Sequence, residues 1–141
     1  GYSSAASDVY KRQIYYDSKT GNVERFIEKV RLLTKWSFVK IHDGIAVTEV
    51  GHLITFTTQI GKAPLSTLKF MEQWHSYIVS VSASGNMNWG NNFALAANTI
   101  SQEYKIPILL KFELAGLDRD VNSFIQKVTD YANKEMDTPQ Q

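Results

Sequence analysis

Three short polar loops hold most of the residues whose chemistry suggests a bound ligand. The first loop reads DSKTGN, residues 17–22, and lies between an apolar run and a helical pattern. Its hydroxyl donors and the unpaired first N–H groups of a helix together bind a phosphate without needing a cationic side chain. The loop therefore predicts a phosphate site, whereas the alternative is an ordinary helix cap. The candidate residues are Ser18, Lys19, Thr20, Gly21 and Asn22.

Two further loops resemble the first in composition. They read TTQIGKAP (residues 57–64) and SASGNMNWGNNF (residues 82–93), are rich in Gly, Ser, Thr and Asn, and contain no carboxylate. The second of them places Trp89 between Asn88 and Gly90. A flat heteroaromatic ligand needs an aromatic wall and backbone polar groups at its edge, which these loops supply. We expect Trp89 to contact such a ligand, the alternative being packing in the core.

Alternating strand and helix patterns predict the scaffold that brings these loops together. Apolar runs predict strands at residues 13–16, 38–41, 53–57, 78–82 and 108–112. Apolar residues at helical spacing predict helices at 22–33, from Pro64 onward, around 93–104 and around 121–128. This alternation is typical of a parallel sheet covered on both faces. We expect an α/β, flavodoxin-like three-layer sandwich with a five-stranded parallel sheet in order 2-1-3-4-5.

The ligand of such a sheet lies at the carboxyl ends of the strands, where the strand order reverses. The G-x-G-x-x-G fingerprint and the Walker A loop are both absent from the sequence, which disfavours NAD and ATP. The chain has no cysteine, so thiolate and iron–sulfur chemistry are excluded. The three histidines lack metal-like spacing, and we expect them at the surface or at helix ends. FMN is the mononucleotide that suits this fold and this phosphate loop, and we predict no metal site.

The composition indicates one ordinary globular domain. The chain has 141 residues and a formal net charge of +1, without a basic stripe for nucleic acid or an apolar run that crosses a membrane. We expect residues 1–12 to be a mobile N-terminal extension or leader; the alternative is that Val9 and Tyr10 lengthen the first strand. Residues 13–135 form the predicted FMN-binding domain, and 136–141 form a polar tail. A cytoplasmic location is expected.

At its loops the sequence resembles the NrdI family, the flavodoxin-like FMN proteins of class Ib ribonucleotide reductase systems. The matching segments are YDSKTGNVERFIEK (16–29), ITFTTQIGKAP (54–64), SASGNMNWGNNFA (82–94) and IPILLKFELAG (106–116). The resemblance implies non-covalent FMN that, when reduced, reacts with O₂ to give superoxide or peroxide. This oxidant would activate the radical cofactor of the small reductase subunit, NrdF, which is either dimanganese or metal-free. The resemblance also implies an unidentified reductant as a partner.

The resemblance assigns residues to each part of the cofactor. Residues Ser18 to Asn22 would hold the phosphate. The residues that would flank the isoalloxazine are Thr57, Thr58, Gln59, Ile60 and Gly61. The residues that would line its other side and polar edge are Ser84, Gly85, Asn86, Trp89 and Gly90. Phe112 and Leu114 of the FEL segment would close the pocket.

One position departs from the family pattern. Many members have Thr-Thr-Gly-Phe-Gly where this chain has TTQIG, so that Gln59 replaces a glycine. In flavodoxin-like proteins a peptide near flavin N5 can flip on reduction, and glutamine makes the positive φ that this requires costly. We therefore expect either that the flip is absent or costly here, or that the loop already has the conformation of the reduced state. Two other interpretations stay open: a conventional electron-transfer flavodoxin, and a flavodoxin-fold interaction module without flavin. The neutral charge and the absence of acidic residues in the second and third loops argue against the first of these, because acidic surfaces steer flavodoxin docking.

Overall fold

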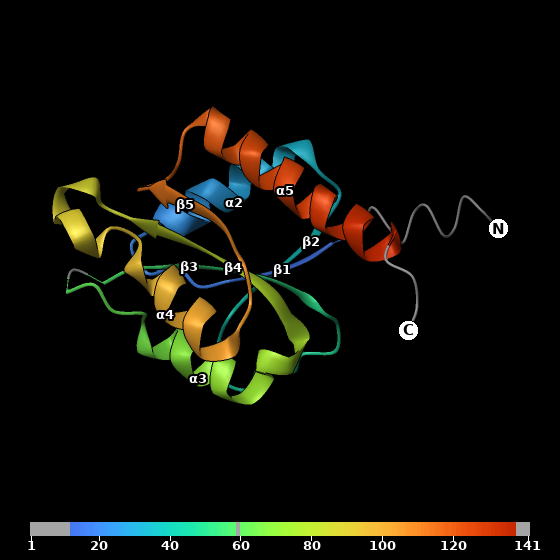
Figure 1. The fold of residues 1–141 in the computed structure, drawn as a ribbon, viewed down its shortest axis with the longest axis horizontal. Helices are drawn as coiled ribbons and strands as arrows, with labels where there is room; N and C mark the ends of the chain where they lie inside the picture. Colours follow the sequence, from blue (N-terminus) through green and yellow to red (C-terminus); the bar gives the residue numbers. More distant parts are fainter. Residues whose placement is uncertain (1–11, 59, 138–141) are drawn as a thin grey trace.

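A computed structural model describes residues 12–58 and 60–137, in which strands and helices alternate (Figure 1). The strands are β1 (Gln13–Tyr16), β2 (Ser37–Lys40), β3 (Gly51–Phe56), β4 (Ile78–Gly85) and β5 (Ile108–Glu113). The α-helices are α2 (Asn22–Leu33), α3 (Leu65–Trp74), α4 (Leu95–Tyr104) and α5 (Asp118–Asp137). Two short 3-10 helices, η1 (His75–Tyr77) and η2 (Met87–Asn92), flank β4.

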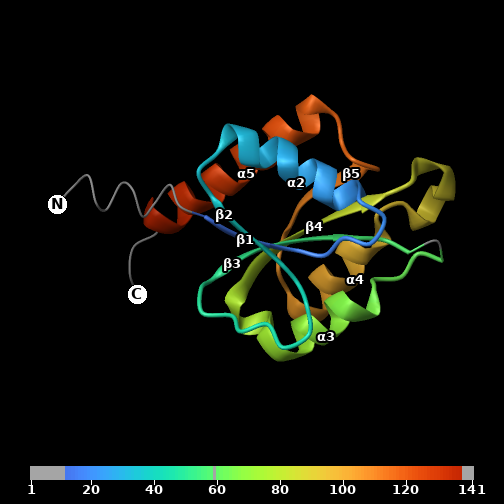
Figure 2. The same cartoon turned by 180° about the vertical axis from the view of Figure 1, so that it is seen from behind.

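The five strands form one parallel sheet in the order β2-β1-β3-β4-β5. The predicted α/β fold class and strand order are therefore confirmed. Helices α2 and α5 cover one face of the sheet, and α3 and α4 cover the other (Figures 1 and 2). The connection after β1 runs to β2 on one side, whereas the connection after β3 runs to β4 on the other side, so the carboxyl ends of β1 and β3 flank the switch point.

Side chains that alternate along the strands build a core on each face. Tyr15 of β1 faces α3 and α4, whereas its neighbours Ile14 and Tyr16 face α2 and α5. The apolar stripe of α2 is buried as its helical spacing predicts. Its members are Val23, Phe26, Ile27 and Val30.

The ends of four strands differ from the predictions. Strands β2 and β3 end one residue earlier than predicted, at Lys40 and Phe56, and β5 ends one residue later, at Glu113. Strand β2 begins one residue earlier and β3 two residues earlier, because the parallel ladders with β1 and β4 extend to Ser37 and Gly51. Strand β4 continues three residues beyond its predicted end, because its ladder with β5 pairs Ser84 with Phe112 and Gly85 with Glu113. The predicted third loop is thus partly strand and partly the 3-10 helix η2.

The expectation that all three histidines lie at the surface or at helix ends is wrong for His52. Its side chain is only 4% exposed, because β3 is a central strand with helices over both faces. The ring hydrogen bonds through Nδ1 to the Ser80 hydroxyl at 2.7 Å, and it forms a T-shaped contact with the Tyr131 ring, with the ring centroids 5.4 Å apart. His42 is exposed, and His75 follows the last residue of α3.

The predicted ends of the domain fall partly outside the described residues. Residues 1–11 lie outside them, and with them the alternative that Val9 and Tyr10 extend β1. Helix α5 runs to Asp137, into the predicted tail, and residues 138–141 are also outside. Among the helices of residues 12–58 and 60–137, none combines the length and apolar character that crossing a membrane requires.

Candidate functional site

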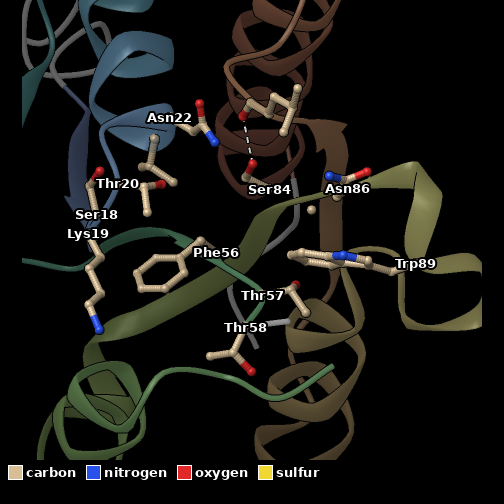
Figure 3. Close-up of a pocket in the computed structure, with 13 residues that line it drawn as sticks. Ser18, Lys19, Thr20, Asn22, Phe56, Thr57, Thr58, Ser84, Asn86 and Trp89 are labelled. Carbon is tan, nitrogen blue, oxygen red and sulfur yellow. Dashed lines mark hydrogen bonds between the residues drawn. The ribbon is translucent and has the colours of Figure 1, made fainter. Parts of the chain in front are cut away.

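A cavity of about 560 Å³ opens at the carboxyl ends of β1, β3 and β4, beside the switch point of the sheet (Figure 3). Its size falls within the range of about 300–1,000 Å³ that small-molecule and cofactor sites occupy. The loops after β1, β3, β4 and β5 all contribute to its wall. The lining residues are Ser18, Lys19, Thr20, Asn22, Val23, Phe56, Thr57, Thr58, Ser84, Gly85, Asn86, Trp89 and Leu114.

The loop after β1 forms the polar end of this cavity. Gly21 has a φ of 96°, a left-handed conformation that favours glycine and turns the chain into α2. The Ser18 hydroxyl accepts a hydrogen bond from the backbone N–H of Glu24 at 3.2 Å, so this side chain caps the helix. The first N–H groups of α2, at Asn22 and Val23, have no partner within the helix. The loop thus serves as a helix cap and also leaves donors facing the cavity.

Two aromatic rings form the opposite walls of the cavity. Figure 3 shows the ring of Phe56, at the end of β3, across the cavity from the ring of Trp89 in η2. Trp89 is partly exposed and lies outside both core clusters, so it does not pack in the core. Sequence analysis missed Phe56, although the last residue of a central strand at the switch point is a position from which a side chain reaches a ligand.

Backbone hydrogen bonds fix the 3-10 helix that carries Trp89. The Trp89 N–H donates to the carbonyl oxygen of Asn86 at 3.0 Å, and the Asn86 side chain accepts from the Asn88 N–H at 2.9 Å. The N–H of Met87 donates to a carboxylate oxygen of Glu113 at 3.1 Å. Glu113 therefore brings a negative charge to a loop that has no acidic residue of its own.

The loop after β3 contributes Thr57 and Thr58 to the cavity. Thr57 is buried, and its hydroxyl accepts from the Ala96 N–H at 3.3 Å while its own N–H donates to the Ser84 carbonyl at 3.0 Å. Gly61 has a φ of 80°, and a Cβ built there would come within 2.8 Å of the Asn92 side chain. This close approach joins the loop after β3 to η2.

Four further predicted residues of these loops are described by the structure and do not line the cavity: Gly21, Ile60, Gly61 and Gly90. Ile60 is 70% exposed, and Gly21, Gly61 and Gly90 take part through their backbone turns, each with a positive φ. Gln59 is outside the described residues, so its predicted effect on the peptide flip stays a prediction.

The β5 segment divides between the core and the cavity. The Phe112 side chain is 1% exposed and stacks on Phe26, with ring centroids 4.1 Å apart, so it does not line the cavity. This placement differs from the expectation that Phe112 closes the pocket. Phe112 still lies on the regular strand, whose alternation turns its side chain toward α2 and α5, whereas Leu114 has left the strand with a φ of 53°. Leu114 alone of the two reaches the cavity wall.

The role of a buried carboxylate at the start of the first loop was also missed. Asp17 is 6% exposed, and one of its oxygens accepts hydrogen bonds from the hydroxyls of Ser66 at 2.5 Å and Thr67 at 2.6 Å. Its backbone N–H donates to the Ile54 carbonyl. Asp17 thus ties the start of the loop after β1 to the first turn of α3. A single acidic residue in a loop sequence carries no signal of this role.

Comparison with known proteins agrees with this geometry. The family described as NrdI flavodoxin-like matches residues 14–126. A curated relative, the protein NrdI of Bacillus licheniformis, is 45% identical over 116 residues, which cover 82% of this chain and 86% of the relative.

Solved flavodoxins share the fold at much lower identity. Oxidised flavodoxin 2 from Bacillus cereus superposes with a TM-score of 0.66 at 22% identity, covering 88% of this chain and 99% of that one. A short-chain flavodoxin associated with a bacterial microcompartment gives a TM-score of 0.69 at 17% identity, covering 91% and 99%. The flavodoxin of Streptococcus pneumonia TIGR4 gives a TM-score of 0.66 at 19% identity, covering 87% of this chain and 98% of that one.

Proposed function

This chain belongs to the NrdI flavodoxin-like family, and we propose that it binds one FMN without a covalent bond and serves a class Ib ribonucleotide reductase. The observation that carries the proposal is a cavity with two chemically different ends. Hydroxyls and helix N–H groups gather at one end, while aromatic rings and uncharged polar groups gather at the other. Phosphate suits the first end and an isoalloxazine ring suits the second.

The donor set fits the proposed cofactor. At the phosphate end the hydroxyls of Ser18 and Thr20 and the first N–H groups of α2 are all donors, and Lys19 adds the only charged side chain among the described residues of the lining. A phosphate there is stabilised by hydrogen bonds and by the dipole of α2. Ser18 keeps its own hydroxyl hydrogen for the ligand, because its oxygen accepts from Glu24.

Residues at the other end would orient the ring system. Phe56 and Trp89 would cover its faces or edges and exclude water, as flat apolar walls do. Thr57, Thr58 and Asn86 would meet its polar edge with hydroxyl, amide and backbone groups. The chain would thereby tune the flavin through local charge and hydrogen bonding.

The proposed role is the supply of an oxidant. The chemistry that bound FMN would supply here is transfer of electrons to O₂, giving superoxide or peroxide, and an unidentified reductant would return the flavin to its reduced state. Exposed apolar side chains next to the cavity support docking of a partner there: Ile60 is 70% and Met87 62% exposed, and Leu114 at the wall is 45% exposed. We propose the small reductase subunit, NrdF-like, as this partner, and a cytoplasmic location for the pair.

One experiment tests the role apart from cofactor binding. The FMN-loaded protein is reduced anaerobically and mixed with O₂, and superoxide and peroxide are measured with and without a purified class Ib small subunit. We expect rapid oxidant formation and activation of the small subunit's radical cofactor. Slow oxidation without activation, combined with electron delivery to a ferredoxin-type partner, would return the protein to the conventional flavodoxin class.

A further inference from the structure

Arg25, one turn into α2, holds the side chain of a residue that lines the cavity. Its Nη2 donates a hydrogen bond to Oδ1 of Asn22 at 2.5 Å. Figure 3 shows the consequence for Asn22: its amide oxygen is turned away from the cavity, and its amide nitrogen points inward toward the side of Ser84. Arg25 itself is exposed and does not line the cavity.

The two ends of a primary amide have nearly the same shape but opposite hydrogen-bonding character. The nitrogen donates and the oxygen accepts, so the neighbour of an asparagine decides which end faces a ligand. A guanidinium has five N–H donors and no acceptor, and it therefore fixes the oxygen on its own side. With Arg25 on the outside, only the donor end of Asn22 is left for the cavity.

We propose that Arg25 is a positioning residue that makes Asn22 a dedicated donor to the phosphate and thereby sets the preference for a phosphorylated flavin. This inference rests on the proposed function, which puts a phosphate at the loop after β1. Without Arg25 the amide rotates freely between its two orientations, and one of them presents an oxygen lone pair to an anion. The loss therefore falls on the phosphate and not on the ring system.

The turn before α2 leaves room for this arrangement. A Cβ built on Gly21 would lie 2.9 Å from Nη1 of Arg25, so the guanidinium packs directly against the left-handed turn. Among the described residues Arg25 has no carboxylate within ion-pair distance, whereas Lys40, near the same helix, pairs with Glu24 at 3.5 Å. Its hydrogen bond to Asn22 is thus the interaction that holds its position.

The test compares FMN with riboflavin, which lacks the phosphate. Apoprotein is titrated with each flavin, and quenching of flavin fluorescence gives the two dissociation constants. We expect Arg25→Met to weaken FMN binding about tenfold, the scale of one hydrogen bond to a charged group, and to leave riboflavin binding unchanged. Arg25→Lys, which keeps a donor, should recover part of the loss. The matched control is Arg31→Met. Arg31 is exposed, lies about two turns further along α2 and pairs with Glu28, so this variant should bind both flavins as the wild type does.

A double-mutant cycle separates positioning from simple charge attraction. If Arg25 acts through Asn22, then Arg25→Met should have no further effect on FMN binding in the Asn22→Ala background. An undiminished tenfold loss in that background, or an equal loss for riboflavin, would overturn the inference while leaving the proposed function standing. A wild-type apoprotein that binds neither flavin would overturn the proposed function and this inference with it.

Discussion

The hydroxyl of Ser84 donates a hydrogen bond to the carbonyl oxygen of Leu114, with 2.6 Å between the two oxygens (Figure 3). The N–H of Leu114 donates in turn to the carbonyl of Gly85 at 2.9 Å. These bonds hold Leu114 in a left-handed backbone conformation, with a φ of 53°, which is unfavourable for a leucine. The end of β4 therefore fixes the loop after β5 as a wall of the cavity.

Ser84→Ala removes one of these bonds and should loosen the wall. We expect the free energy of unfolding to fall by about 1–2 kcal/mol, and FMN to dissociate faster because Leu114 no longer holds one position. Ser101→Ala is a matched control, since the Ser101 hydroxyl donates to the Ile106 carbonyl at the same 2.6 Å but away from the cavity. Urea unfolding and stopped-flow release of FMN should show similar stability losses but a faster release only for Ser84→Ala. Equal rates of FMN release from the two variants would show that the Ser84 hydrogen bond does not hold the cavity wall against the cofactor.

Trp89→Ala should raise the fluorescence of bound flavin, because a neighbouring indole quenches an excited flavin. The fold should stay intact, since Trp89 lies outside both core clusters. Trp89→Phe keeps an aromatic wall and should retain most of the FMN affinity. Steady-state fluorescence measures the emission and the binding of the flavin, and circular dichroism measures whether the fold is intact. Unchanged fluorescence in Trp89→Ala would place the flavin away from this ring.

His52 should make stability depend on pH on the acid side of neutrality. Burial, with a smaller contribution from the positive charge of Arg12, lowers its pKa from 6.5 to about 4 in the folded protein. The unfolded chain therefore binds a proton between about pH 6.5 and 4 that the folded chain does not, so the free energy of unfolding falls as the pH decreases through this window. The full loss is about 3 kcal/mol, reached below pH 4.

His52→Gln provides the control for this pH dependence. It removes the titrating ring, and its unfolding free energy should change less between pH 7 and 4 than that of the wild type. Denaturant unfolding at several pH values compares the two proteins. Parallel curves for both would show that other groups cause the acid sensitivity.

The two reduction steps of the bound flavin should have similar potentials. Within residues 12–58 and 60–137, those that line the cavity include no carboxylate and one lysine, so little negative charge opposes the fully reduced anionic flavin. The Glu113 carboxylate, which accepts a hydrogen bond from the Met87 N–H, does add negative charge near the cavity. Glu113→Gln removes this charge and should raise the potential of the second step. A stepwise dithionite titration should show only modest accumulation of half-reduced flavin. Nearly quantitative accumulation, with a very negative second potential, would indicate an electron-transfer flavodoxin.

The sequence was sufficient for the fold because its periodic signals are local. The predicted bounds of β1 and α2 are confirmed. For α2 the reason is that Gly21 directly precedes the helix and its apolar residues follow the helical spacing. The strand order followed from general rules for parallel sheets. The burial of His52 could not be predicted, because it depends on which strand becomes central and on what α5 places beside it.

The candidate site was predictable in its loops but not in its individual side chains. Composition indicated the three loops, yet whether Phe56 or Phe112 faces the cavity depends on where a strand ends. Phe112 is still on β5 and turns into the core, whereas Leu114 leaves the strand and reaches the wall. Contacts between distant segments, such as Asp17 with Ser66 and Arg25 with Asn22, depend on three-dimensional geometry that a single sequence does not carry.

The amount of FMN per chain tests the central claim most directly, measured on the purified protein and on apoprotein titrated with FMN. The account predicts one FMN per chain and an absorption band near ~450 nm, which belongs to the cofactor. Thr20→Leu should lose a hydroxyl donor, crowd the phosphate and lower the affinity severely, while Thr99→Leu, an exposed threonine on α4, should bind FMN normally. A colourless protein that takes up no FMN, or full occupancy in Thr20→Leu, would contradict the assignment of this cavity to FMN.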